Sequence, residues 1–273
     1  MATLKEIQNC QLEMLKVVAD ICEKHNIRYY LAAGTFLGAV RHQGFIPWDD
    51  DIDIYVFNSD LKKLKKICQK ELPEKYFWQD YKTDKGTPYI MPKIRNTKTY
   101  MPETDNAKTN QGIWLDIFPL MLRASDEKKF RKQVYYISKY QYNLANQMKI
   151  FGSHFNSFPK MIYCILRELF VFRPLTQIYY HKALRLGDKK SRLCFALDVS
   201  FFGKCDEQMI KITNRESYKT DMFKSMQKYS FEKYSFYGVE DYNQYLSAKF
   251  GENYMTPKRY THFDDYSNVK IND

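Results

Sequence analysis

An aspartate-rich segment, residues 49–55, constrains the fold of this chain most. It reads DDDIDIY, so acidic and apolar side chains alternate over most of its length. An alternation with a period of two is typical of a β-strand, which would place Asp51 and Asp53 on one face and bury the isoleucines on the other. Asp49 joins the acidic face if the chain is already extended there. We therefore predict a buried strand from Asp49 to Val56.

Several carboxylates on one strand face repel one another, which is a cost that a structural role rarely justifies. A divalent cation removes the conflict, and ligation by oxygen alone points to Mg²⁺ or Mn²⁺. Mg²⁺ in particular takes waters and substrate phosphates as its remaining ligands. The alternative is a solvated acidic turn, which the flanking apolar alternation disfavours.

A second acidic residue, Asp116, lies in an otherwise apolar run, residues 112–120, which reads GIWLDIFPL. An unpaired carboxylate in a buried strand is energetically expensive. A cation shared with Asp51 and Asp53 would account for it, and a buried ion pair with an arginine is the alternative.

Two further features suit phosphate groups. Gly34 and Thr35 stand between a predicted strand and a predicted helix, where backbone N–H groups and a hydroxyl can hold phosphate oxygens. Lys93 and Arg95 lie two residues apart on one face of a predicted strand and would neutralise the same phosphates. The alternative for this pair is an ordinary polar strand face.

Hydrophobic periodicity divides the chain into three regions. Helices are predicted at 3–25 and 59–71, and strands at 27–32, 75–80, 88–95 and 112–118. Helical spacing then dominates from 125 to about 220. We expect a mixed α/β core over residues 1–122, a mainly helical region over 123–225, and a C-terminal segment over 226–273 that returns to the core.

The chain carries 43 Lys and Arg against 32 Asp and Glu, a formal net charge of +11. This excess suits nucleic acid, an anionic membrane surface or a phosphorylated small molecule. Six cysteines without a CxxC pair, and an N-terminus without an apolar signal segment, predict a cytoplasmic protein. The apolar stretch 161–172 is too short to span a bilayer; it either packs inside as a core helix or lies in a membrane interface, giving a peripheral contact.

In combination, these motifs resemble the LicD family, which includes phosphocholine transferases and is related to fukutin and fukutin-related protein. The resemblance covers roughly residues 1–120, with a weaker match to the family's closing pattern at 241–262. The run before the aspartates carries it, together with Leu115 to Pro119: Gly34, Thr35, Arg41, His42, Gly44, Phe45, Ile46, Pro47 and Trp48.

The resemblance implies an α/β (α+β) fold of the nucleotidyltransferase type, a mixed sheet flanked by helices, with a mainly helical second region. Residues 1–122 would then be the catalytic core and residues 123–225 an insertion or acceptor region. It implies Asp51 and Asp53 as metal ligands, Asp116 as the third acid, and Asp49 as a further acidic ligand position. The matched substrate-binding positions are Gly34, Thr35, Arg41, His42, Trp48 and, at the C-terminus, His262. One departure precedes the closing motif, where 236–241 lacks the proline that relatives often carry.

The implied reaction transfers a phosphoalcohol such as phosphocholine from a CDP-activated donor, for example CDP-choline, to a sugar hydroxyl. The acceptor would be a lipid-linked or soluble precursor of a cell-surface glycan, teichoic acid or capsule. Nucleotidyl transfer would use the same carboxylates and stays open. A basic RNA-binding module is a third alternative, but many aromatic residues fall at apolar-periodic positions, so no nucleic acid partner is expected.

Overall fold

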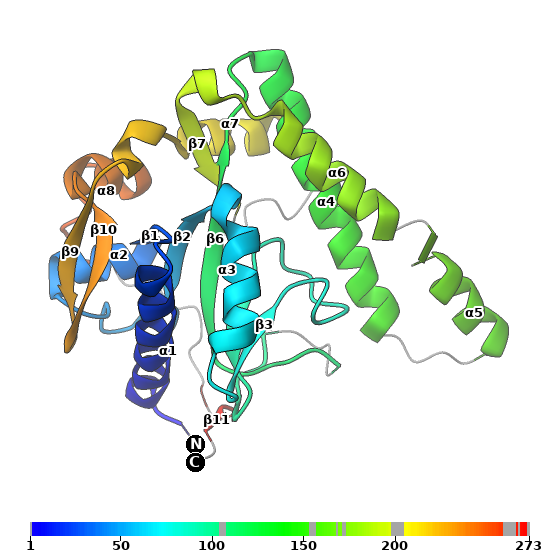
Figure 1. Ribbon diagram of the computed structural model, residues 1–273, viewed down its shortest axis with the longest axis horizontal. Coiled ribbons are helices and arrows are strands. Elements are labelled where there is room, and N and C mark those ends of the chain that lie inside the picture. The colour runs from blue at the N-terminus through cyan, green and yellow to red at the C-terminus, as the bar shows by residue number, and fades with distance from the viewer. Residues whose placement is uncertain are drawn as a thin grey trace.

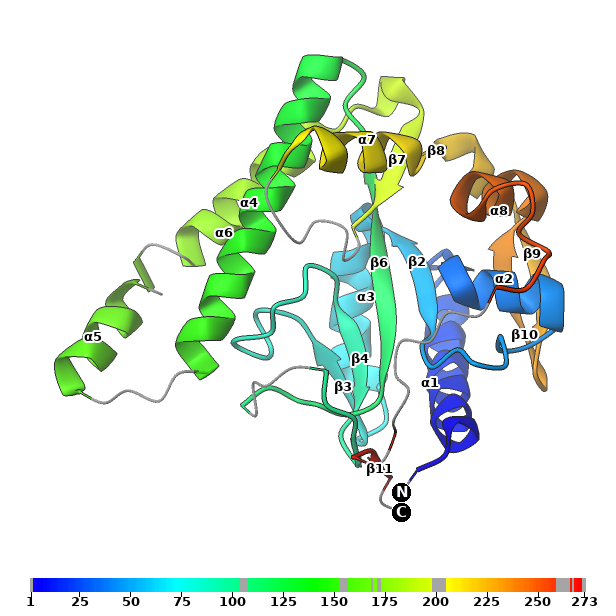
Figure 2. The same cartoon turned by 180° about the vertical axis from the view of Figure 1, so that it is seen from behind.

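The structure is a computed structural model that describes residues 2–103, 108–152, 157–167, 169–170, 173–197, 205–258, 266 and 268–271. A mixed β-sheet lies at its centre, with helices on both sides and a long helical projection at one edge (Figure 1) (Figure 2). The predicted α/β class, a mixed sheet flanked by helices, is confirmed.

The central sheet has the strand order β1-β2-β6-β4-β3, and β7 and β8 extend it from β6. β2 runs parallel to β6, whereas β1 on β2, β4 on β6, β3 on β4, β7 on β6 and β8 on β7 are antiparallel. β6 is almost continuously apolar because it is buried on both faces. The strands are β1 (Tyr29–Leu31), β2 (Asp53–Phe57), β3 (Tyr76–Gln79), β4 (Lys93–Asn96), β6 (Trp114–Leu122), β7 (Leu193–Ala196) and β8 (Ser217–Lys219).

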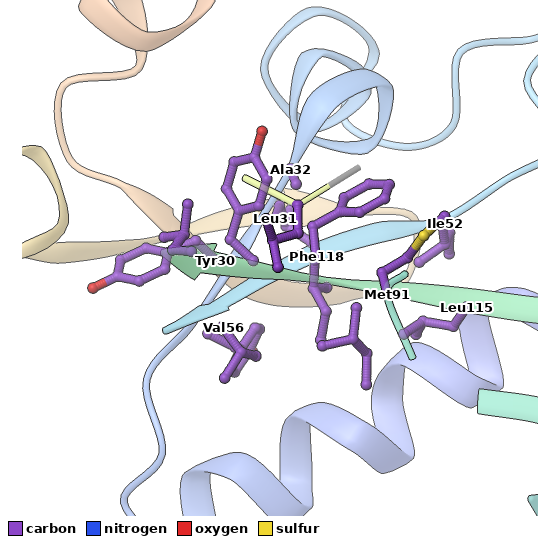
Figure 3. Close-up of a cluster of buried hydrophobic side chains, with 14 of the residues drawn as sticks. Tyr30, Leu31, Ala32, Ile52, Val56, Met91, Leu115 and Phe118 are labelled. Carbon is purple, nitrogen blue, oxygen red and sulfur yellow. The ribbon is translucent and has the colours of Figure 1, made fainter. Parts of the chain in front are cut away.

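Two amphipathic helices, α1 (Leu4–Lys24) and α3 (Asn58–Glu71), pack together beside the sheet (Figure 1). α1 begins with the capping box that its sequence predicts, since Thr3 accepts the Glu6 N–H and Glu6 accepts the Thr3 N–H. Val56 and Leu115 belong to the buried cluster at the heart of the sheet (Figure 3). This core fixes β2 and β6, the two strands that carry the predicted acids.

Residues 127–215 form most of the helical projection. α4 (Glu127–Gly152) and α6 (Arg173–Leu186) lie along each other, with Tyr136 stacked on Tyr179 at 6.1 Å between ring centroids. α5 (Phe158–Arg167) lies at the far end of this pair, and α7 (Glu207–Arg215) packs on α4 (Figure 2). The region predicted as mainly helical also contributes two strands, β7 and β8, to the central sheet.

The C-terminal residues return to the N-terminal elements. The hairpin of β9 (Met226–Phe231) and β10 (Tyr234–Val239) packs on β1 and on α2 (Ala33–His42). A Cβ on Gly238 would lie 2.3 Å from the Phe36 ring, so the hairpin approaches α2 as closely as glycine permits. α8 (Tyr242–Phe250) then packs on α2, and β11 (Lys270–Ile271) pairs with β5 (Thr99–Tyr100).

The strand predicted from Asp49 begins later, at Asp53. The carbonyls of Asp49 and Asp50 accept hydrogen bonds from the side chains of Gln8 and Gln11 on α1, at 2.9 and 2.7 Å. These side chains satisfy the backbone that a neighbouring strand would otherwise have to pair, so the acidic run starts as a loop. In the described part of the chain, no helix is long and apolar enough to cross a membrane.

Candidate active site

A cavity of about 660 Å³ lies against strands β2, β4 and β6. Alternate residues of two strands line it: Asp53 and Tyr55 from β2, and Trp114, Asp116 and Phe118 from β6. The residues between them are buried in the hydrophobic core. The acidic and apolar alternation in the sequence thus corresponds to a cavity side and a core side of the sheet.

The predicted acids meet at this cavity. Asp53 lies opposite Asp116 in the parallel register of β2 and β6, and Asp49 and Asp51 line the same cavity from the preceding loop. The Asp53 N–H donates to Thr35 Oγ1 at 2.8 Å, which anchors the start of β2 to α2. Residues that are 63 positions apart in the sequence therefore share one wall because two strands pair in parallel.

Burial, followed by mutual repulsion, raises the pKa values of Asp53, Asp49 and Asp116. Burial and the neighbouring Asp51, Asp116 and Asp49 raise the pKa of Asp53 well above its usual range. Burial, followed by Asp51 and Asp50, raises the pKa of Asp49 to about 8. For Asp116, burial raises the pKa to about 6, although Lys93 opposes the shift. The site concentrates more negative charge than its protein surroundings neutralise.

Lys93 is the main cation beside these acids. It lies opposite Asp116 in the register of β4 and β6, and its Nζ is 2.9 Å from Asp116 Oδ1 and 2.9 Å from Glu103 Oε1. The Tyr89 and Trp114 rings flank the same ammonium, at 4.3 and 4.7 Å from the ring centroids. Asp116 therefore has a buried lysine partner where the sequence suggested a cation or an arginine.

Arg95 supports this arrangement from behind. Its guanidinium forms an ion pair with Glu103 and donates to Gln79 Oε1 and the Gly112 carbonyl, both at 2.8 Å. Arg95 is almost fully buried and does not line the cavity, whereas Lys93 does. The two basic residues share a strand face as predicted, but of these two only Lys93 lines the cavity.

The start of α2 forms another wall. Gly34 lines the cavity, and a Cβ at this position would lie 2.8 Å from Asp49 Oδ2, so glycine permits the close approach of the carboxylate. The Ala33 N–H donates to the Tyr245 hydroxyl at 3.0 Å, and that hydroxyl donates to Tyr55 at 3.0 Å. Tyr245 of α8 thereby fixes the first residue of α2.

The remaining predicted residues fall on both sides of the cavity wall. Arg41 and Trp48 line it, whereas Thr35 is buried behind it and His42 lies outside the lining. His42 Nδ1 accepts from Arg41 Nε at 3.3 Å, and burial together with Arg41 lowers the pKa of the imidazole. His262 lies outside the described residues.

The C-terminal segment completes the cavity with residues that the motif analysis did not single out. Lys249, Asn253 and Lys258 line it, and Arg41 Nη1 donates to the Tyr254 carbonyl at 2.8 Å. The closing pattern at 241–262 was the sequence signal for this wall. The buried Gln8 and Gln11 were also missed, although glutamines within the apolar stripe of a predicted helix could have identified them.

The atoms at the cavity that could ligate a metal ion include the carboxylate oxygens of the aspartates. Asp53 Oδ1 is buried and has no hydrogen-bond partner among the described residues. Across that same part of the chain, no three Asp, Glu, His or Cys side chains already stand in a metal-ligating group. Two carboxylates with substrate phosphates suffice for Mg²⁺, so the residues fit an ion that arrives with its substrate.

Comparisons with known proteins find relatives of the segment that carries this cavity. Residues 26–158 match the family model described as LicD/FKTN/FKRP, nucleotidyltransferase domain. The lipopolysaccharide cholinephosphotransferase LicD of Haemophilus influenzae is 35% identical over 118 residues, which cover 42% of this chain and 43% of that protein. The ribitol 5-phosphate transferase FKRP of Mus musculus and that of Homo sapiens are each 34% identical over 55 residues, 20% of this chain and 11% of each relative.

The chain thus spans less than half the length of these curated relatives. The family match includes α2, the acidic loop and strands β2, β4 and β6, which together form most of the cavity. The family match and the Haemophilus relative together support assigning the segment of residues 26–158 to the LicD family.

Proposed function

We propose that this protein is a phosphotransferase that moves a phosphoalcohol, of the phosphocholine type, from a CDP-activated donor to a sugar hydroxyl. The carrying observation is that Asp51, Asp53 and Asp116 line one cavity beside Lys93, within the segment that matches the LicD family. The name of the Haemophilus relative supports a cholinephosphate donor group, and the name of the FKRP relatives supports a ribitol phosphate.

We further propose Mg²⁺ or Mn²⁺ as the cofactor. Asp51 and Asp53 would hold it, with Asp116 and Asp49 as the further acidic positions. The unpaired Asp53 Oδ1 and the raised pKa values of Asp53 and Asp49 support this proposal, because a cation would stabilise carboxylates that burial and mutual repulsion disfavour. Such an ion supplies charge stabilisation for a transferring phosphoryl group and for a diphosphate leaving group.

The protein residues have separate roles in this proposal. Lys93 and Arg41 on the cavity wall, and Lys258 at its exposed side, would offset the charge of the donor diphosphate. Asp116 would accept the proton of the acceptor hydroxyl, and its pKa of about 6 lies close to the range that suits a general base near neutral pH. Glu103 and Arg95 would keep Lys93 in place.

The acceptor in this proposal is a lipid-linked or soluble precursor of a cell-surface glycan or teichoic acid, modified in the cytoplasm. The six cysteines are free thiols in the structure, which supports a reducing compartment.

Nucleotidyl transfer is the second candidate, favoured by the family description as a nucleotidyltransferase domain. In this reaction the acceptor attacks the α-phosphorus and retains the nucleotide, and pyrophosphate or a phosphoalcohol is released. The products separate the two reactions, because phosphoalcohol transfer releases CMP, whereas nucleotidyl transfer leaves a nucleotide on the acceptor.

The decisive experiment incubates the protein and Mg²⁺ with a panel of CDP-alcohols and candidate glycan acceptors, and measures CMP release. Asp51→Asn and Asp53→Asn should each abolish release while the far-UV circular dichroism stays unchanged. Asp20→Asn, at an exposed position of α1, is the matched control and should retain activity. Appreciable activity in either cavity variant would refute the assignment.

A further inference from the structure

An exposed apolar face runs along α5. Phe158, Ile162, Ile165 and Leu166 recur at helical spacing, which puts them on one side of the helix. Their exposed fractions are 69%, 40%, 47% and 49%. Residues of this kind normally pack into a core, and a contiguous apolar patch on a protein surface marks an interaction site. We call these four residues the α5 apolar face.

The α5 apolar face lies far from the proposed active site. Figure 1 and Figure 2 both show α5 at the distal end of the α4 and α6 projection, away from the central sheet that carries the cavity. A role in closing the cavity is therefore excluded by position. The described elements of the chain leave this face exposed, so we look for its partner outside them.

The charge of the projection identifies the class of partner. Residues 128–186 contain eleven lysines and arginines but a single acidic residue, Glu168, so this segment holds nearly all of the net charge of +11. On α6, Ile178, Lys182 and Arg185 are all exposed and recur at helical spacing. An exposed apolar helix face within a strongly basic segment is the combination that binds an anionic lipid surface.

Two other partners fit less well. A second copy of this chain would bring two strongly basic segments together, and like charges repel. A nucleic acid would be attracted by the charge, but three of the four side chains of the α5 apolar face are aliphatic, and within that face only Phe158 offers a ring on which a base could stack. The exposed aliphatic side chains gain only from a partner with an apolar interior.

We propose that the α5 apolar face and the basic side of α6 dock this protein peripherally on a membrane rich in anionic phospholipid. The apolar face enters the boundary between head groups and acyl chains, while Lys182 and Arg185 contact lipid phosphates. This proposal concerns a surface separate from the cavity and does not depend on the transferase activity.

The test is co-sedimentation of the full chain with vesicles of phosphatidylcholine alone or of phosphatidylcholine and phosphatidylglycerol in equal parts. We expect binding to the anionic vesicles that weakens as salt is added, and little binding to the neutral ones. Ile162→Glu should lower the partition coefficient by at least about tenfold. Ile271→Glu is the matched control, because Ile271 is also 40% exposed but belongs to β11, and it should bind like the parent.

A second pair of variants tests the charge. Lys182→Glu combined with Arg185→Glu should weaken binding to anionic vesicles more than Lys62→Glu combined with Lys66→Glu, which changes the net charge equally on α3. Equal weakening by the two pairs would overturn the proposed orientation. The proposal is also overturned if the parent stays in the supernatant with anionic vesicles, or if Ile162→Glu and Ile271→Glu bind these vesicles alike. A dimer that Ile162→Glu converts to a monomer would instead identify a second copy of the chain as the partner. RNA that displaces Ile162→Glu and Ile271→Glu from the vesicles equally well would instead point to a nucleic acid.

Discussion

Replacing Asp53 by Asn should stabilise the metal-free protein while it abolishes the proposed activity. Asp53 is 6% exposed, and burial together with Asp51, Asp116 and Asp49 raises its pKa well above the ordinary value. Asparagine has nearly the same shape but carries no charge, so it removes the repulsion without opening a cavity. The Thr35 bond to the backbone N–H at this position is retained.

The magnitude follows from proton linkage. In the unfolded chain the pKa of an aspartate is about 3.9, so from about pH 4 upward the unfolded state ionises while folded Asp53 keeps its proton. The parent then loses about 1.4 kcal/mol of stability per pH unit until the folded pKa is reached. At about pH 6 the parent has therefore lost at most about 3 kcal/mol of unfolding free energy. Because Asp53 shares protons with the other acids, the loss can be smaller, and we expect Asp53→Asn to be more stable than the parent by about 1–3 kcal/mol.

The assay is urea unfolding followed by circular dichroism, with EDTA present, at about pH 4 and about pH 6. The two proteins should have similar unfolding free energies at the lower pH and differ at the higher one. Asp80→Asn is the control with the opposite sign. Burial opposes ionisation of Asp80, but bonds from Lys65 and Trp78 hold its pKa below the usual value. Its loss should cost about 1–3 kcal/mol.

A variant Asp53→Asn that is less stable than the parent at about pH 6, or a difference that does not depend on pH, would refute this reasoning. Mg²⁺ provides an independent check. Its addition should raise the unfolding free energy of the parent and narrow the gap to Asp53→Asn, because only the parent retains the full set of carboxylates.

Three further substitutions test how the cavity is built. Gln11→Leu should destabilise the protein by about 1–3 kcal/mol in urea unfolding, because the Asp50 carbonyl loses its buried donor; an unchanged midpoint would contradict this. Gly34→Ala should lower transferase activity at least about tenfold although alanine favours a helix by about 1 kcal/mol, because its Cβ would displace Asp49; full activity would show that the approach is unimportant. Lys258→Gln should raise KM for a CDP-alcohol by roughly five- to tenfold with little change in kcat, and a change confined to kcat would place Lys258 elsewhere in the reaction.

Much of the N-terminal half could be predicted from local patterns. The helices predicted at 3–25 and 59–71 are α1 and α3, and the predicted strands correspond to β1, β3, β4 and β6. These predictions hold because apolar periodicity and capping residues act over a few neighbouring positions, where the sequence states them directly. The start of β2 was misplaced because two glutamines on α1, about 40 residues away, bind the loop carbonyls.

The sequence alone singled out residues that line the cavity: the closely spaced Asp51 and Asp53, the isolated Asp116, and Gly34 at the start of a helix. Only the tertiary structure decided how they are arranged. Parallel pairing of β2 with β6 sets Asp53 beside Asp116, antiparallel pairing of β4 brings Lys93 to the same acid, and α8 closes the cavity from beyond residue 240. Strand register and long-range packing depend on the whole core, so no local pattern encodes which partner a buried charge will find.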